Sequence, residues 1–251
     1  MSDETIRAFS ARACAAPMER AAERFTEQTG IDVELMVCSR HCHPSVIDEA
    51  DASDVSGMPH FLTEVAEIPG LDLVVAGAGY LADDGEMLGI LDPEHRVCLG
   101  YRRSALLVQP GNPKGIRGLA DLERPNVTIS ISMIDCLKGS HEDVFAATHR
   151  SECIRPQIAL RVSGCVALVE AVTQGAVDVA IGWSAFEHLA PGDVEIVELA
   201  MPPAIERETT ISLRRNGANP AGAIRFLDFL RDGGADEGLV SNGWTLPEAR
   251  A

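Results

Sequence analysis

Short apolar runs alternate with amphipathic stretches along most of the chain. The segment "IDVELMV" alternates apolar and polar positions and contains β-branched residues, which predicts a strand. The preceding segment "APMERAAERFTEQTG" repeats apolar positions at Met18, Ala21 and Phe25, which would share one face of a helix. Pro17 suits the first turn of that helix, and Gly30 suits its end. Strand and helix alternate in this way repeatedly, which predicts an α/β fold with mainly parallel sheets.

The same patterns assign the remaining elements. Further strands are predicted at "TIRAFSA", "LDLVVAG", "RVCLGYRRSALLV", "NVTISIS", "QIALRVS", "VDVAIGW" and "TTISLRR". Further helices are predicted at "HFLTEVAEI", within "KGIRGLADLERP", at "SHEDVFAATHRSE" and "VALVEAVTQG", and as a pair in "NPAGAIRFLDFLRDGGADEGLVSNG". Ser140 and Asp143 are spaced like a capping pair. The polar segment "PSVIDEADASDVSGMP" is predicted to be a loop or insertion.

Composition narrows the classes of function. A hydrophobic fraction of 46% and a charged fraction of 24% over 251 residues are those of an ordinary globular protein. No stretch approaches the roughly 18 to 20 apolar residues of a membrane span. The net charge of -17 argues against nucleic acid and anionic membranes as partners. Nucleotide-binding, nucleophile-elbow and zinc-protease motifs are absent from the sequence.

The first residues and the cysteines bear on the compartment. The opening "MSDETIRAFSARAC" has acids where a signal peptide would have a basic segment. We therefore expect a cytoplasmic protein, unless this chain is a trimmed form of a periplasmic one. The seven cysteines are an odd number, which argues for reduced thiols over a disulfide framework.

The stretch "MVCSRHCH", at the end of a predicted strand, contains two cysteines and two histidines that are candidate metal or redox residues. Cys38 and Cys42 are spaced C-x3-C, with His41 and His43 beside Cys42. That spacing alone is a weak metal signal, because zinc knuckles use closer pairs and a second pair of ligands. Both histidines fit a solvated loop better than a ligand role.

Several longer segments resemble one family. "ACAAPMERAAERFTEQTGIDVEL", "GLDLVVAGAGYLADDGEMLGIL", "LLVQPGNPKGIRGLADLERPNVTISI", "VALVEAVTQGAVDVAIGW" and "NPAGAIRFLDFL" resemble molybdate/tungstate-type solute-binding proteins of ABC transporters, which have the type II periplasmic-binding-protein fold. The resemblance implies two lobes, residues 1–101 plus 206–251 and residues 102–205, with a ligand cleft between them. It implies a tetrahedral oxyanion held by hydroxyls and by backbone N–H groups at helix N-termini. The segment around residues 43 to 59 lies outside the resemblance.

Placed on that fold, five of the seven cysteines fall on loops that would face the cleft. The resemblance implies a ligand-binding set of Cys14, Cys38, Ser39, Cys42, Asp135, Cys136 and Cys165, of which the cysteines would be metal ligands. Thiols near helix N-termini and cations ionise more readily, and thiolates favour soft metals and iron–sulfur clusters.

Three classes of function follow. The first is a binding protein, not an enzyme, whose cysteine thiolates hold a soft metal ion, a metalloid or an iron–sulfur cluster, and which delivers it to a metal-centre acceptor protein. The second is the molybdate/tungstate-type oxyanion-binding component of an ABC transporter. The third is a thiol-dependent reductase or sulfur transferase with Cys38 or Cys42 as nucleophile, although no base and orienting group can be assigned to it.

Overall fold

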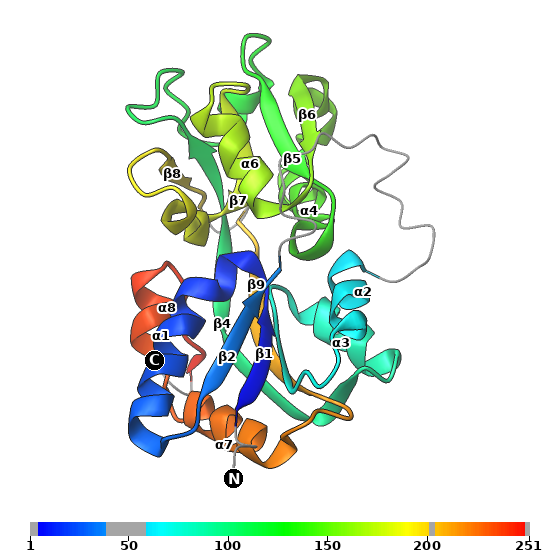
Figure 1. The fold of residues 1–251 in the computed structure, drawn as a ribbon. Coiled ribbons are helices and arrows are strands. Elements are labelled where there is room, and N and C mark those ends of the chain that lie inside the picture. The colour runs from blue at the N-terminus through cyan, green and yellow to red at the C-terminus, as the bar shows by residue number, and fades with distance from the viewer. Residues whose placement is uncertain (1–4, 39–58, 201–203, 249–251) are drawn as a thin grey trace. The chain divides into compact units, whose positions relative to one another are not determined.

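The computed structural model describes residues 5–38, 59–200 and 204–248 (Figure 1). These residues form two compact units, which we call the first and the second unit. The first unit contains the described residues up to Tyr101 and those from Arg207 onward. The second unit contains the described residues of the range Arg102–Glu206. The second unit is thus continuous in sequence between two pieces of the first.

The sheet of the first unit has the strand order β2-β1-β3-β9. β1 runs parallel to β2 and to β3, whereas β3 and β9 are antiparallel. Phe25 of α1 packs against Phe226 of α7, with ring centroids 5.0 Å apart, and Phe9 packs against Phe61 of α2. The strands are β1 (Ile6–Ser10), β2 (Val33–Val37), β3 (Leu73–Ala76) and β9 (Glu206–Arg214). The helices are η1 (Arg12–Cys14), α1 (Ala15–Thr29), α2 (His60–Glu67), α3 (Gly79–Met87), α7 (Pro220–Arg231) and α8 (Asp236–Ser241).

The sheet of the second unit mixes both kinds of pairing. β5 is parallel to β6 and β7, whereas β4 is antiparallel to β7 and β8. A core of buried side chains, among them Leu106, Ile129, Phe145 and Ile181, holds the sheet to its helices. The strands are the part of β4 (Leu91–Val108) from Arg102 onward, β5 (Ile129–Ser132), β6 (Ile158–Val162), β7 (Val179–Trp183) and β8 (Glu195–Glu198). The part of β4 up to Tyr101 belongs to the first unit. The helices are η2 (Leu119–Glu123), η3 (Asp135–Leu137), α4 (Ser140–Ala146), α5 (Ser151–Ile154), η4 (Arg155–Gln157), α6 (Gly164–Thr173) and η5 (Ser184–Leu189).

The strands and helices expected from the sequence patterns are present, but several details differ. The short helices η1, η3, η4 and η5 were not expected. The predicted helix "SHEDVFAATHRSE" is two helices, α4 and α5. The predicted cap at Ser140 is wrong, because Gly139 is the N-cap residue and the Ser140 hydroxyl donates to the Leu137 carbonyl at 2.7 Å. Strand β8 was not expected. The predicted insertion "PSVIDEADASDVSGMP" lies almost wholly outside the described residues.

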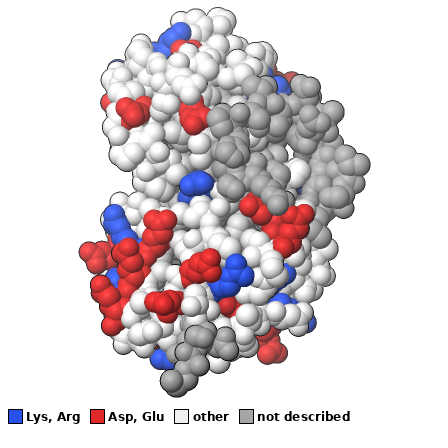
Figure 2. All heavy atoms as spheres, viewed as in Figure 1, with Lys and Arg blue, Asp and Glu red and all other residues white. Residues whose placement is uncertain are grey.

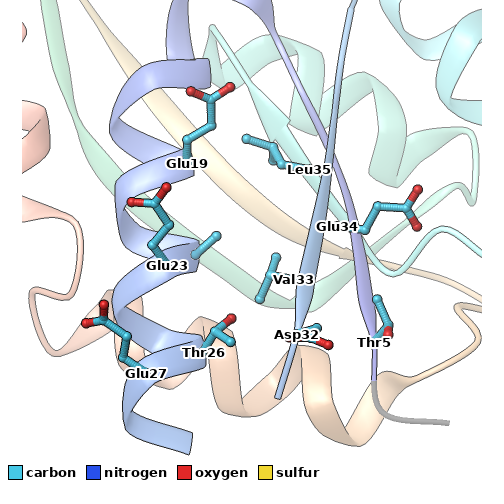
Figure 3. Close-up of a pocket in the computed structure, with 10 residues that line it drawn as sticks. Thr5, Glu19, Glu23, Thr26, Glu27, Asp32, Val33, Glu34 and Leu35 are labelled. Atoms are coloured by element: carbon cyan, nitrogen blue, oxygen red, sulfur yellow. The ribbon is translucent and has the colours of Figure 1, made fainter. Parts of the chain in front are cut away.

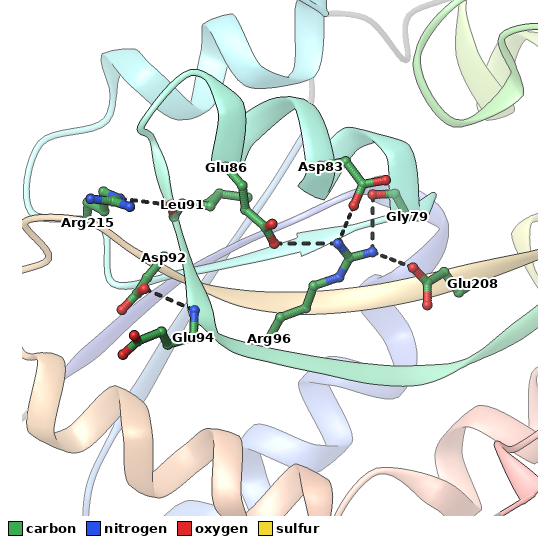
Figure 4. A network of polar contacts seen from close by, with 9 residues as sticks. All are labelled: Gly79, Asp83, Glu86, Leu91, Asp92, Glu94, Arg96, Glu208 and Arg215. Atoms are coloured by element: carbon green, nitrogen blue, oxygen red, sulfur yellow. Dashed lines mark hydrogen bonds and ion pairs between the residues drawn. The ribbon is translucent and has the colours of Figure 1, made fainter.

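One ionic network fastens β4 to its neighbours in the first unit (Figure 4). The Arg96 guanidinium donates to Asp83 and Glu86 of α3, to the Gly79 carbonyl, and to Glu208 of β9. Partial burial opposes the charge of Arg96, but the hydrogen bond to Asp83 and the negative charges around it raise the pKa of Arg96. The side chain therefore stays a cation and links two strands and a helix.

Candidate functional site

In the first unit, the carboxyl ends of β1, β2 and β3 meet at one edge of the sheet, because these strands run parallel. The chain turns there from β1 through η1 into α1, and Cys14 is the N-cap residue of α1. The Cys14 backbone N–H donates to the Ala11 carbonyl at 2.9 Å, and the residue is 1% exposed. Cys14 thus lies at the predicted strand-to-helix turn, with little of its surface accessible.

Cys38 follows β2 at the same edge. Its backbone N–H donates to the Ser10 carbonyl at 2.9 Å, which extends the β1–β2 pairing by one residue. Its thiol donates to Oε2 of Glu64 on α2 at 3.5 Å, and both residues are buried. The thiol is thus bonded to a carboxylate inside the first unit.

The second unit forms a different arrangement where β5 and β6 end. Ser163 is the N-cap residue of α6, and Cys165 lies in the first turn of that helix. The Ser132 hydroxyl, at the end of β5, accepts a hydrogen bond from the Gly164 N–H at 3.0 Å. The first turn of α6 carries no acidic residue. This helix N-terminus therefore has the partial positive charge and the neighbouring hydroxyls that suit an anion.

A buried cation lies in the same unit. Arg102 of β4 is 0% exposed, and its guanidinium lies 5.1 Å from the centre of the Trp183 ring at the end of β7. Its Nη1 is 3.9 Å from Sγ of Cys136 in η3. η3 follows β5, and Trp183 is the last residue of β7. Because β5 and β7 run parallel, both lie at the same edge of the sheet. A buried guanidinium interacts strongly with nearby charged and polar groups, because the effective dielectric constant there is low.

The predicted site residues divide between the two units and the undescribed part of the chain. Cys14 and Cys38 belong to the first unit, and Asp135, Cys136 and Cys165 to the second. Ser39 and Cys42 lie outside the described residues, as do His41 and His43. Within the described ranges, no three His, Cys, Asp or Glu side chains come together as a possible metal site. The thiolate set therefore stays a prediction.

Three residues at these edges were not identified from the sequence. Arg102 was part of an apolar strand pattern, where the pair Arg102–Arg103 was the only signal. Glu64 was only one position of a predicted helix, but it is buried beside Cys38. Ser132 was read as a strand residue, and only the pairing of β5 with β6 brings it to the N-terminus of α6.

The fold itself defines a class. Solved structures of PEB3 from Campylobacter jejuni resemble this chain. The PEB3 structure with bound L-phospholactate has a TM-score of 0.78 at 17% sequence identity, and the match covers 96% of this chain and 100% of the PEB3 chain. The sulfate-binding protein SubI of Mycobacterium tuberculosis H37Rv has a TM-score of 0.76 at 16% identity, with coverage of 98% and 88%. The periplasmic molybdate-binding protein of Azotobacter vinelandii has a TM-score of 0.72 at 14% identity, with coverage of 97% and 100%. The fold is the two-lobed type II periplasmic-binding-protein fold.

Residues 6–245 match the family model described as bacterial extracellular solute-binding protein, so the chain belongs to that family. The expected resemblance is thereby confirmed at the level of the family. No sequence among the curated proteins matches the chain. Within the described ranges, none of the helices is long and apolar enough to span a bilayer.

Proposed function

We propose that this protein binds a small anionic solute, an oxyanion or a molecule that carries a phosphate-like group, and serves an ABC transporter. One observation carries the proposal: the second unit has the N-terminus of α6 and the buried Arg102 at the edge where β5, β6 and β7 end. N–H groups, hydroxyls and a guanidinium are the donors that an oxyanion requires. The fold also houses relatives named for sulfate, molybdate and L-phospholactate.

Ser132 would orient the first N–H of α6, and Ser163 and Cys165 would supply polar groups from the same turn. Arg102 would provide a full positive charge that the backbone dipoles do not. Such charge-assisted hydrogen bonds are roughly twice as strong as neutral ones. The donor set is free of carboxylates in the first turn of α6, so a bound anion meets no local repulsion there.

Calorimetry with sulfate, molybdate, phosphate and L-phospholactate tests this proposal. We expect one of these anions to bind in the presence of a reductant and without any metal. Ser132→Ala should weaken its binding by up to about tenfold, because the Gly164 N–H loses the hydroxyl that orients it, and a neutral hydrogen bond contributes about 1 kcal/mol. Ser130→Ala is the matched control, because Ser130 is equally buried two residues earlier on β5. Equal losses in both variants, or no binding of any of these anions, would contradict the proposal.

The contact between Arg102 and Cys136 favours a second candidate. A guanidinium 3.9 Å from a sulfur stabilises the thiolate form, which is the form that binds soft metals. We propose as this alternative that Cys14, Cys38, Cys42, Cys136 and Cys165 bind a soft metal ion, a metalloid or an iron–sulfur cluster. The donor role of the Cys38 thiol toward Glu64 weighs against it.

Elemental analysis of protein prepared without oxygen separates the two candidates. The thiolate proposal expects a stoichiometric metal or metalloid, and visible charge-transfer absorption if an iron–sulfur cluster is present. Replacement of Cys14, Cys38, Cys136 and Cys165 by serine should then abolish its retention. A metal-free protein in which these four replacements leave anion binding intact would exclude the thiolate reading and leave the oxyanion proposal standing.

A further inference from the structure

A groove of about 690 Å³ lies in the first unit between α1 and β2 (Figure 3). Apolar side chains of both elements form part of its wall: Ala22 of α1, and Val33 and Leu35 of β2. Five carboxylates surround this apolar strip. The groove is lined by Thr5, Glu19, Ala22, Glu23, Thr26, Glu27, Asp32, Val33, Glu34 and Leu35.

The charged side chains that line the groove are all acidic, although one of them, Glu34, is paired with Arg7 at 3.1 Å. Glu19, Glu23 and Glu27 recur every four residues and form a row along α1 (Figure 3). Among the described residues, none of these three nor Asp32 takes part in an ion pair. The cations of α1 are turned the other way, since Arg20 and Arg24 bond to Ser241 and Gly234 beside α8. Figure 2 shows acidic side chains gathered over this part of the unit.

Beside the groove, one side of β2 offers backbone groups. β2 stands at the end of the strand order, and no strand in the described ranges pairs with its outer side. The Asp32 carbonyl accepts from Ile6, and the Cys38 N–H donates to Ser10, so even-numbered residues direct their backbone groups toward β1. The N–H and C=O groups of Val33, Leu35 and Val37 therefore point away from the sheet.

The geometry points to one occupant. We propose that an extended, lysine- or arginine-rich segment of a partner protein adds to the outer side of β2 and places its basic side chains on the carboxylates of α1. Alternate side chains of a strand are about 6.6 Å apart, and residues four apart on a helix are separated by about 6 Å along its axis. Basic residues at every second position would thus meet Glu19, Glu23 and Glu27 in turn. Addition of a strand to an open edge is an established mode of peptide recognition.

Other occupants fit less well. A second copy of this chain would bring a net charge of -17 and the same acidic groove, so like charges would face each other. An anionic solute would be repelled for the same reason. A single metal ion is disfavoured because no three acidic, His or Cys groups of the described chain are placed to hold one. The proposal is independent of the solute-binding site in the second unit.

Fluorescence anisotropy with a labelled peptide of alternating lysine and threonine, about nine residues long, tests the surface. We expect binding that weakens from low to physiological salt. The triple variant Glu19→Gln, Glu23→Gln and Glu27→Gln should bind about tenfold more weakly, given three exposed ion pairs. The matched control replaces three exposed carboxylates elsewhere, Glu94→Gln, Glu152→Gln and Asp193→Asn, and should bind as the unchanged protein does.

Two further measurements test strand addition itself. Hydrogen exchange at the amides of Val33, Leu35 and Val37 should slow when the peptide is bound. Leu35→Pro should abolish binding, because it removes an outward N–H without breaking a bond to β1, whereas Leu35→Ala should retain most of it. A lysine–proline peptide that binds equally well, or unchanged exchange at these amides, would overturn strand addition. If the groove variant and the control variant weaken binding equally, or if the peptide does not bind at all, the proposed docking site is wrong.

Discussion

At the scale of single residues, burial changes what a polar side chain does. Cys38 was expected to be a ligand on a loop facing the cleft, but its sulfur donates to a buried carboxylate. Arg102 was part of a strand pattern, but it is the buried cation of the second unit. In each case the deciding neighbour, Glu64 or Trp183, is far away in the sequence. Periodicity locates such residues on an element but gives no information about which other element covers them.

His141 of α4 gives a prediction about pH. It is 5% exposed, and burial lowers its pKa; Arg155 and Arg161 lower it further, whereas Glu142 raises it. The unfolded chain therefore binds this proton more readily, so the contribution of His141 to stability is complete above about pH 6.5 and is lost as the pH falls below it. Denaturant titrations at pH 7.5 and at pH 5.5 measure this contribution. Between these two pH values, the free energy of unfolding should fall less for His141→Gln than for the unchanged protein, and the two decreases should differ by at most about 1.4 kcal/mol per pH unit. An identical loss in both proteins would contradict this prediction.

At the scale of elements, the sequence predicted most strands and helices correctly. The long helices succeed because their apolar faces are regular, as in α1 with Met18, Ala21 and Phe25 all buried. The errors lie at boundaries, where a local contact decides. Ser140 suits a cap by type, yet Gly139 at φ 70° occupies that position and the serine bonds backward to Leu137. The candidate site was less predictable, because Ser132 and Gly164 meet only through pairing between β5 and β6.

The close packing around Gly182 of β7 gives a prediction about stability. A Cβ added at Gly182 would lie 2.8 Å from Leu107 Cδ1, 3.0 Å from Phe186 and 3.2 Å from Leu168. Gly182→Ala should therefore lower the free energy of unfolding by about 1–3 kcal/mol, as overpacked cores do. Gly118→Ala is the control, because no atom lies within 4 Å of the added carbon there and its φ is extended. Denaturant titration of both variants measures the difference. Equal free energies of unfolding for Gly182→Ala and Gly118→Ala would contradict the prediction, because they would show that the side chains around β7 rearrange at no cost.

At the scale of the whole molecule, charge dominates the solution behaviour. A net charge of -17 on 251 residues opposes the compact state through self-repulsion. Sodium chloride screens that repulsion, so the Tm should rise by several degrees between about 20 and 200 mM. Chloride is used because sulfate is a candidate solute. A Tm that is flat or falls over this range would indicate that ion pairs such as those of Arg96 outweigh the repulsion.

The compartment and the lobe boundaries stay predictions. Cytoplasmic residence was expected from the acidic opening of the chain, and fractionation of cells that express the natural gene would test it. The fold and the family follow from the alternating pattern and the resemblance together, since strands, helices and their order extend over nearly all the matched residues. The identity of the solute does not follow, because it depends on side chains such as Arg102 that the fold leaves free to vary.

The split of the first unit has a consequence during synthesis. The described residues of the second unit all lie between Arg102 and Glu206, so they leave the ribosome together and can acquire their structure while translation continues. The first unit cannot fold completely at that stage, because the partners of its early elements are synthesised late. β3 pairs with β9, and Phe25 packs against Phe226, which is about 200 residues later in the chain. The apolar face of α1 therefore stays exposed until the last helices emerge. We expect the nascent first unit, and not the second, to require a chaperone in the cell.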